Sequence, residues 1–172
     1  MWKAIGAFLI LFSASMEGTR HAHKIREEYE ELQKIRYLIS LLKSEICYAR
    51  SSLGEVFASV AEKCEDPYRN WLLMMRNEMR CKKEKRFVKI WQESADVCLV
   101  GLMISRKEKE NLKEVGARLG NLDLKMQIRS LELYEEKVEE SLRQIQKQMY
   151  TKMRLYYLMG IMGGILTVVL LI

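Results

Sequence analysis

The chain has 172 residues, of which 49% are hydrophobic and 30% charged, with a formal net charge of +6. This balance excludes a disordered chain, and the positive excess is too small to require a nucleic-acid partner. The length suits one domain with a modest core rather than two domains.

An apolar run, Ala4 to Met16, opens the chain and is preceded by Lys3. It is short for a membrane span. A cleaved signal peptide is the alternative, because Lys3 supplies a basic start and Ser13 to Ser15 are small residues where a peptidase could cut. We expect a retained membrane anchor over residues 1–18, since Trp2 can lie at a membrane interface.

Helical periodicity follows, and no alternating apolar stretch predicts a strand. The sequence therefore predicts an all-α chain, with a six-helix, bundle-like domain over residues 19–154. A first helix of about 25 residues begins near Ile25 and ends near Tyr48 to Arg50. Ser52 and Glu55 have the spacing of a capping box. They start a second helix with the apolar face Leu53, Val56, Phe57, Val60 and Cys64.

Asp66-Pro67 predicts the start of a third helix, because Asp caps helices and Pro suits the first helical turn. Its apolar face is Tyr68, Trp71, Leu72, Met75 and Met79. After the basic run Arg80 to Lys89, a fourth helix follows with the face Phe87, Ile90, Trp91, Val97 and Cys98. Gly101 is expected to loosen the chain before the next helix.

The fifth helix is predicted from about Arg106 to Gly120-Asn121, where a left-handed glycine would end it. The sixth starts at Asp123 and keeps one apolar stripe into the end of the chain, about 70 Å in all. The stripe is Leu124, Ile128, Leu131, Tyr134, Val138, Leu142, Ile145, Met149, Met153 and Tyr156. A bend near Tyr150 would weaken any mechanical role for this helix.

Residues 155–172 carry no charge and, as a helix, cover about 27 Å, close to the thickness of a bilayer core. We expect a C-terminal transmembrane helix, in which Gly160 and Gly164 share a face suited to helix packing. Basic residues beside both anchors, including Lys24 and Lys147, place the domain between them in the cytoplasm by the positive-inside rule.

Residues for catalysis are scarce. His21 and His23 lack a third metal ligand nearby, and the four cysteines, although 17 residues apart, lack the close pairs of a zinc site. We expect buried, reduced thiols. No glycine-rich phosphate loop or serine nucleophile elbow is present. The prediction is a protein that is not an enzyme and needs no metal, cofactor or small-molecule substrate.

The basic run offers the best local signal of an interaction, through Lys82, Lys83, Lys85 and Arg86. A solvated helix junction is the plain interpretation, and anionic lipid headgroups or an acidic partner are the others. Nucleic acid is disfavoured, because no aromatic residues are interleaved with the charges. An acidic patch on the sixth helix is expected to be its solvated face, with docking as the minority alternative: Glu132, Glu135, Glu136, Glu139 and Glu140.

The run from Leu112 to Gly120, followed by Asp123 and Gln127, resembles the signature of the stage III sporulation protein AB family. Leu42, Glu45-Ile46, Tyr48 and Leu53 resemble the family's first helix and its turn, while Tyr157 and Gly160 match its final span. Ser51-Ser52 stands where the family pattern has Thr-Pro. The resemblance covers nearly the whole chain and is most specific between Gly116 and Gln127.

The resemblance implies a relative of the helical domain of the platform protein, or F component, of type II secretion and type IV pilus machines. It also implies a place in the mother-cell membrane around the forespore, within a sporulation channel complex required for endospore formation. The expected partners are an ATPase like stage III sporulation protein AA, other membrane components of the complex, and lipids.

Two functions remain open at this point: a platform that couples the ATPase to membrane assembly, and a passive scaffold of the same complex. A secreted helical protein is a remote third. The contacts that we expect for the ATPase are Leu112, Gly116, Gly120, Asp123 and Gln127, together with the basic run. The glycines also have a structural interpretation, as positions of close helix packing and a helix C-cap.

Overall fold

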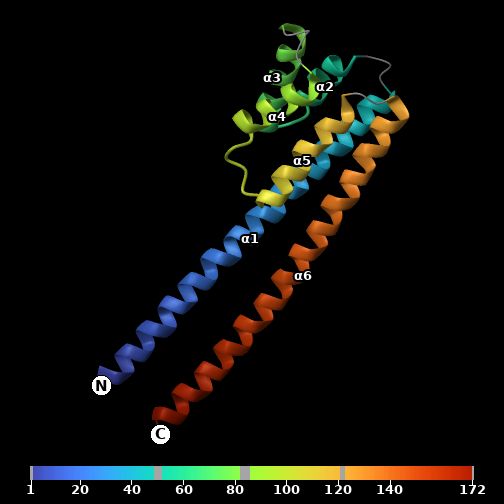
Figure 1. The fold of residues 1–172 in the computed structure, drawn as a ribbon. Helices are drawn as coiled ribbons and strands as arrows, with labels where there is room; N and C mark the ends of the chain where they lie inside the picture. Colours follow the sequence, from blue (N-terminus) through green and yellow to red (C-terminus); the bar gives the residue numbers. More distant parts are fainter. Residues whose placement is uncertain (1, 49–51, 82–85, 121–122, 172) are drawn as a thin grey trace.

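The computed structural model describes the backbone of residues 2–48, 52–81, 86–120 and 123–171, and the side chains of residues 23–151 within these ranges together with Leu155. Six helices and no strand account for these residues (Figure 1), which confirms the predicted all-α fold. The helices are α1 Trp2–Tyr48, α2 Leu53–Ala61, α3 Tyr68–Cys81, α4 Phe87–Cys98, α5 Arg106–Leu119 and α6 Leu124–Leu171.

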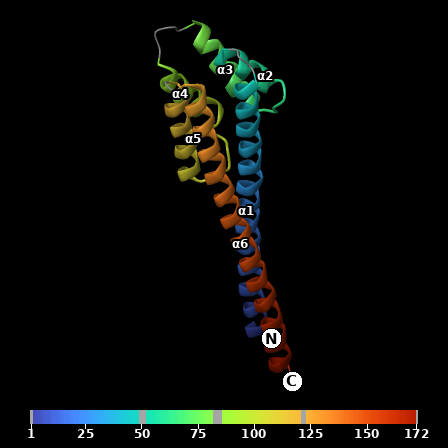
Figure 2. The ribbon, with the colours of Figure 1, turned by 90° about the vertical axis from the view of Figure 1, so that its right-hand side faces the viewer.

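Two long helices form the frame of the molecule. α1 has 47 residues and α6 has 48, so each extends for about 70 Å. They run antiparallel, and both views place the two chain ends beside each other, while α2 to α5 gather at the opposite end (Figures 1 and 2). Each helix packs against the next one in the chain, and α6 packs against α1, so the six helices close a ring.

The interface between α1 and α6 is the apolar stripe that the sequence predicts. α1 and α6 bury side chains at spacings of three and four, which place them on one helix face. These are Leu32, Ile35, Leu38, Ile39, Leu42 and Ile46 on α1, and Leu131, Tyr134, Val138 and Leu142 on α6. Lys43 and Glu135 join the two helices with an ion pair of 2.6 Å. α6 continues as one helix through Tyr150, so the described backbone has no break there.

Aromatic side chains fill the core between the shorter helices. The rings of Trp71 and Trp91 meet edge to face, with centroids 4.7 Å apart and planes at 72°. The ring centroids of Phe57 and Trp91 are 6.3 Å apart. Such pairs stabilise by about 1 kcal/mol beyond their burial. The indole N–H of Trp71 donates to the Ser94 hydroxyl at 3.2 Å, so this buried donor is paired.

The caps predicted at Ser52 and Asp123 are present, α3 begins at Tyr68 directly after the turn at Asp66-Pro67, and the stop predicted at Gly120 differs. The Ser52 amide donates to the Glu55 carboxylate at 3.3 Å, and the Asp123 carboxylate accepts from the Met126 amide at 3.0 Å. Gly120 is the C-cap of α5, but with φ −77° and ψ −22° it is right-handed. The predicted left-handed stop at Gly120 is wrong, and its lack of a side chain serves packing against α4 instead.

Other expectations about burial are also wrong. Val97 is 63% exposed, because α4 buries Ile90, Trp91, Ser94 and Ala95, and Val97 points away from that face. Leu124 is 54% exposed in the first turn of α6, and contact of the stripe with the core begins one turn later, at Ile128. The thiols were expected to be buried, yet two of the four free cysteines, Cys47 and Cys81, are exposed.

The expected anchors, residues 1–18 and 155–172, fall in the outer parts of α1 and α6. Apart from Leu155, their side chains lie outside the described residues, and so do the predicted packing glycines Gly160 and Gly164. Within the described part of the chain, no helix is long and apolar enough to cross a membrane.

Candidate interaction site

Two glycines of the signature run bring α5 unusually close to α4. A Cβ atom at Gly116 would lie 2.1 Å from Cγ of Trp91, and one at Gly120 would lie 2.7 Å from Cδ1 of Phe87. Both distances are too short for real side chains. Because both pairs are four residues apart, the two aromatic rings of α4 fit into one groove along α5.

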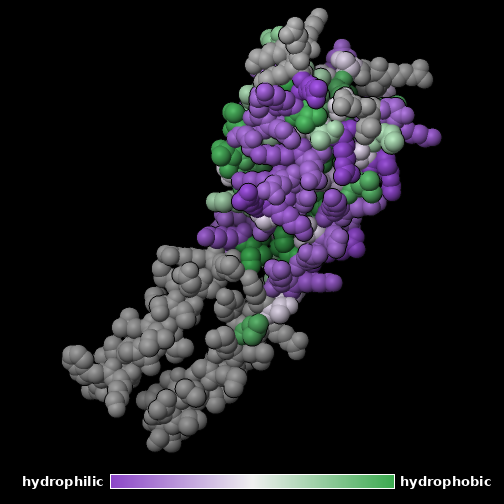
Figure 3. Space-filling model, in the orientation of Figure 1, coloured by the Kyte–Doolittle hydropathy of each residue, from purple (hydrophilic) through white to green (hydrophobic). Residues whose placement is uncertain are grey.

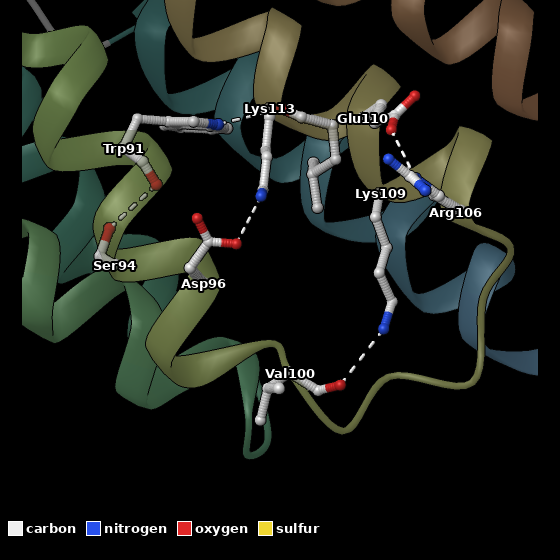
Figure 4. Close-up of polar contacts among 9 residues, drawn as sticks. Trp91, Ser94, Asp96, Val100, Arg106, Lys109, Glu110 and Lys113 are labelled. Atoms are coloured by element: carbon white, nitrogen blue, oxygen red, sulfur yellow. Dashed lines mark hydrogen bonds and ion pairs between the residues drawn. The ribbon is translucent and has the colours of Figure 1, made fainter.

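The groove also satisfies a buried donor. The indole N–H of Trp91 donates to the backbone carbonyl of Leu112 at 3.0 Å (Figure 4). Leu112 lies one turn before Gly116, and its side chain is only 2% exposed. The missing side chain at Gly116 therefore makes room for the ring, and the ring fixes the register between α4 and α5.

The end of the signature run builds the turn from α5 into α6. The Gln127 side-chain amide donates to the Leu119 carbonyl at 2.8 Å, which satisfies a carbonyl in the last turn of α5. The Asp123 carbonyl accepts from the Gln127 amide at 2.9 Å. The motif thus holds three consecutive helices, α4, α5 and α6, in a fixed arrangement.

This placement divides the predicted contact residues into two groups. Leu112 and Gly116 are buried, and Gly120 and Gln127 are partly buried and used within the fold. Asp123 is exposed, as are the neighbouring residues Ala117, Arg118 and Lys125. A partner can reach only the second group without disturbing the core, and its contact there stays a prediction.

The basic run lies in the connection between α3 and α4. Lys82, Lys83 and Lys85 are outside the described residues, so their arrangement is not part of the site described here. Arg86 precedes α4 directly and is exposed. Along the chain, α4 and α5 therefore lie between the basic run and the turn at Asp123.

A buried carboxylate was missed by the sequence reasoning. Glu108 is 4% exposed and accepts from the Ser141 hydroxyl at 2.8 Å and, more weakly, from the Asn111 amide at 3.4 Å. It ties α5 to α6. The signal was present in the sequence, because Glu108 is four residues before Leu112 and so shares the buried face of α5.

Two tyrosines, Tyr68 and Tyr134, are also buried. The pKa of Tyr68 lies well above its usual 10.0. Burial is the main cause, and the second is the Glu31 carboxylate, which accepts a hydrogen bond from the Tyr68 hydroxyl at 2.8 Å. Burial, and then the charge of Glu108, raises the pKa of Tyr134 in the same way. The Tyr134 hydroxyl has no hydrogen-bond partner among the described residues.

The described residues offer few candidate metal ligands close to one another. His23 is exposed, 3.3 Å from Glu27, and the side chain of His21 lies outside the description. No three His, Cys, Asp or Glu residues in the described ranges lie together as metal ligands would. The site is thus a set of helix contacts with an exposed polar edge.

Comparisons with known proteins agree on one family. A family model described as stage III sporulation protein AB matches residues 3–172. A solved structure titled "Stage III sporulation protein AB (SpoIIIAB)" is similar, with a TM-score of 0.64 and 20% sequence identity. The similarity covers 72% of this chain and 97% of that one. No curated protein sequence matches.

Proposed function

Because the chain belongs to the stage III sporulation protein AB family, we propose that it is the membrane platform of a sporulation complex, which couples a cytoplasmic ATPase to assembly in the mother-cell membrane. Membership of a stage III sporulation family indicates that the protein acts in sporulation. The coupling role is our inference from the shape of the molecule and from the resemblance to type II secretion platform proteins.

The observation that supports coupling most directly is the pair of uninterrupted helices α1 and α6. A displacement at one end of a stiff helix pair must appear at the other, provided that neither helix bends. α6 runs without interruption from the turn at Asp123 to Leu171. The ion pair between Lys43 and Glu135 and the continuous buried stripe hold it to α1.

The proposed membrane anchors are the outer parts of the same two helices. Residues 155–172 are uncharged, and residues 4–16 are apolar. Both chain ends lie at the same end of the molecule (Figure 2), which is the arrangement that two anchors in one bilayer require. In this arrangement α2 to α5 project into the cytoplasm.

We place the ATPase contact at the opposite end, on the exposed edge of the turn between α5 and α6. Arg118, Asp123 and Lys125 are exposed there, at the start of the long helix that leads to the proposed membrane end. The groove of Gly116 and Gly120 contributes by holding this edge rigid rather than by touching the partner.

The test uses the full chain in detergent with the companion ATPase, an enzyme like stage III sporulation protein AA. We expect co-purification that depends on nucleotide, and a changed rate of ATP hydrolysis. Arg118→Glu should weaken binding, whereas Arg143→Glu should not, since Arg143 is also exposed but lies about 30 Å further along α6. Absence of binding in every nucleotide state would favour a passive scaffold and contradict the proposal.

A further inference from the structure

A recess opens on the side of α4 and α5 that lies away from the turn at Asp123. It has a volume of about 120 Å³ and lies between the last turn of α4, the connection 99–105 and the first half of α5. Its walls are mostly apolar: Ala95, Leu99, Leu102, Ile104 and Leu112. An apolar space of this order holds a group the size of one Leu, Ile or Met side chain.

Exposed apolar side chains occur at the end of α4 and in the connection that follows it, and one of them, Val100, lines the recess. Val97, Val100 and Met103 are 63%, 75% and 59% exposed, and they fall within seven residues of one another. Figure 3 shows apolar surface along this edge of the molecule, next to the largely hydrophilic face of the other helices. Single exposed apolar residues are ordinary, but an exposed apolar side chain such as Val100 that lines an apolar recess adds to the area a partner could bury there.

The mouth of the recess carries one cation without an anionic partner in the described part of the chain. Lys113 pairs with Asp96, and Arg106 pairs with Glu110 at 3.0 Å. Lys109, by contrast, donates to the neutral carbonyl of Val100 at 3.2 Å (Figure 4). A carboxylate that arrived at the mouth would therefore gain an ion pair there without breaking one.

We propose that this recess is a docking site for a segment of a partner protein that presents a Leu, Ile or Met side chain next to an Asp or Glu. The apolar side chain enters the recess and contacts Leu99 and Leu102, the carboxylate binds Lys109, and the exposed side chain of Val100 contacts the segment. The walls supply the burial, and Lys109 supplies the selectivity for an acidic neighbour.

The shape and charge of the site fit a protein segment better than a bilayer surface. The recess takes one side chain and has one cation free for an anion among the described residues, whereas binding of anionic headgroups needs a surface rich in cations. Asp96 lines the recess and pairs with Lys113, which removes that cation from the charges a headgroup could bind. A protein segment with one carboxylate beside its apolar side chain needs only the single ion pair that Lys109 offers.

The docking site is separate from the proposed ATPase contact. The connection 99–105 lies on the side of α5 that faces the chain ends, and the Ser105 amide donates to Glu28 of α1 at 2.9 Å. The turn at Asp123 is at the other end of α5 (Figure 1). The inference therefore concerns a second partner and does not depend on the ATPase.

The probe is an array of nine-residue peptides with a central Leu, Ile or Met and Glu at varied flanking positions. Matched peptides carry a central Ser, or Lys in place of Glu, and anionic phosphatidylglycerol vesicles form a separate arm. Binding of the full chain in detergent is measured by fluorescence anisotropy. We expect binding only to peptides that combine the apolar centre with the acidic flank.

Two variants connect binding to the recess. Ala95→Met fills it, and Lys109→Glu reverses the charge at its mouth; each should weaken binding at least tenfold while circular dichroism stays unchanged. Lys107→Glu is the matched control, since Lys107 is exposed and makes the same charge change without lining the recess. The proposal is overturned if no peptide binds, if Ala95→Met binds like the wild type, or if the chain binds only the vesicles.

Discussion

Replacement of Gly116 by alanine tests the groove that holds α4 against α5. The new Cβ would lie 2.1 Å from Cγ, 2.2 Å from Cδ1 and 2.7 Å from Cβ of Trp91, so the contact involves the base of the side chain as well as the ring. A change of rotamer alone cannot relieve it, and the ring or α5 itself must move.

The magnitude follows from three effects. Overpacking of a core costs about 1–3 kcal/mol. Displacement of the Trp91 ring breaks its hydrogen bond to Leu112 and leaves a buried donor unpaired, at about 1–3 kcal/mol. Alanine is the better helix former by about 1 kcal/mol, which offsets part of this loss. The net expectation is a loss of about 3 kcal/mol in the free energy of unfolding.

The assay is urea unfolding of the full chain in detergent, followed by tryptophan fluorescence. Gly54→Ala is the matched control, because Gly54 lies in α2 with nothing within 4 Å of the added Cβ. It should be neutral or stabilising by up to about 1 kcal/mol. Combining Gly116→Ala with Trp91→Ala should cost less than the two changes summed, since Cγ and Cδ1 of Trp91 are removed and only the 2.7 Å approach to its Cβ remains. If Gly116→Ala unfolds at the same urea concentration as the wild type, the close packing is refuted.

The remaining predictions concern the two buried tyrosines and the long helices α1 and α6. Above pH about 10, Tyr68 and Tyr134 stay protonated in the folded chain but ionise when it unfolds, so stability should fall by about 1.4 kcal/mol per pH unit for each. Urea titrations between pH 8 and 11 measure this, and a double phenylalanine variant should lose the slope. A double-mutant cycle to alanine at Lys43 and Glu135 should give a coupling of about 0.5–1 kcal/mol, and zero coupling would show that the pair does not stabilise the hairpin. A flexible insertion after Tyr150 should abolish the effect on ATPase rate yet keep assembly, and a retained rate effect would contradict transmission along α6.

The sequence predicts the helices well because their stripes are long and their caps are standard. Ser52 with Glu55, and Asp123 before α6, mark helix starts that the structure confirms. Val97 and Leu124 were misassigned for a different reason: periodicity identifies a face, but the end of that face depends on neighbouring helices. The exposure of Val97 could be known only once the position of α4 was fixed.

The candidate site shows a similar limit. Gly116 and Gly120 could be recognised as packing positions, but nothing in the local sequence names Trp91 and Phe87 as their partners. The recess at Lys109 was not predicted at all. It arises where the end of α4 and the start of α5 diverge, and a spacing pattern within one helix carries no information about the gap between two.

The closed ring of helices has a consequence for how the chain is made. Neighbours in the ring are neighbours in the chain except for α1 and α6, whose ion-paired residues Lys43 and Glu135 are 92 positions apart. During synthesis α1 to α5 can pack on their neighbours as they leave the ribosome, while the face of α1 that contacts α6 has no cover until α6 is made. The face of α1 that α6 covers is therefore exposed for longer than the contacts among α2 to α5, so it has the longest exposure to aggregation and to chaperones.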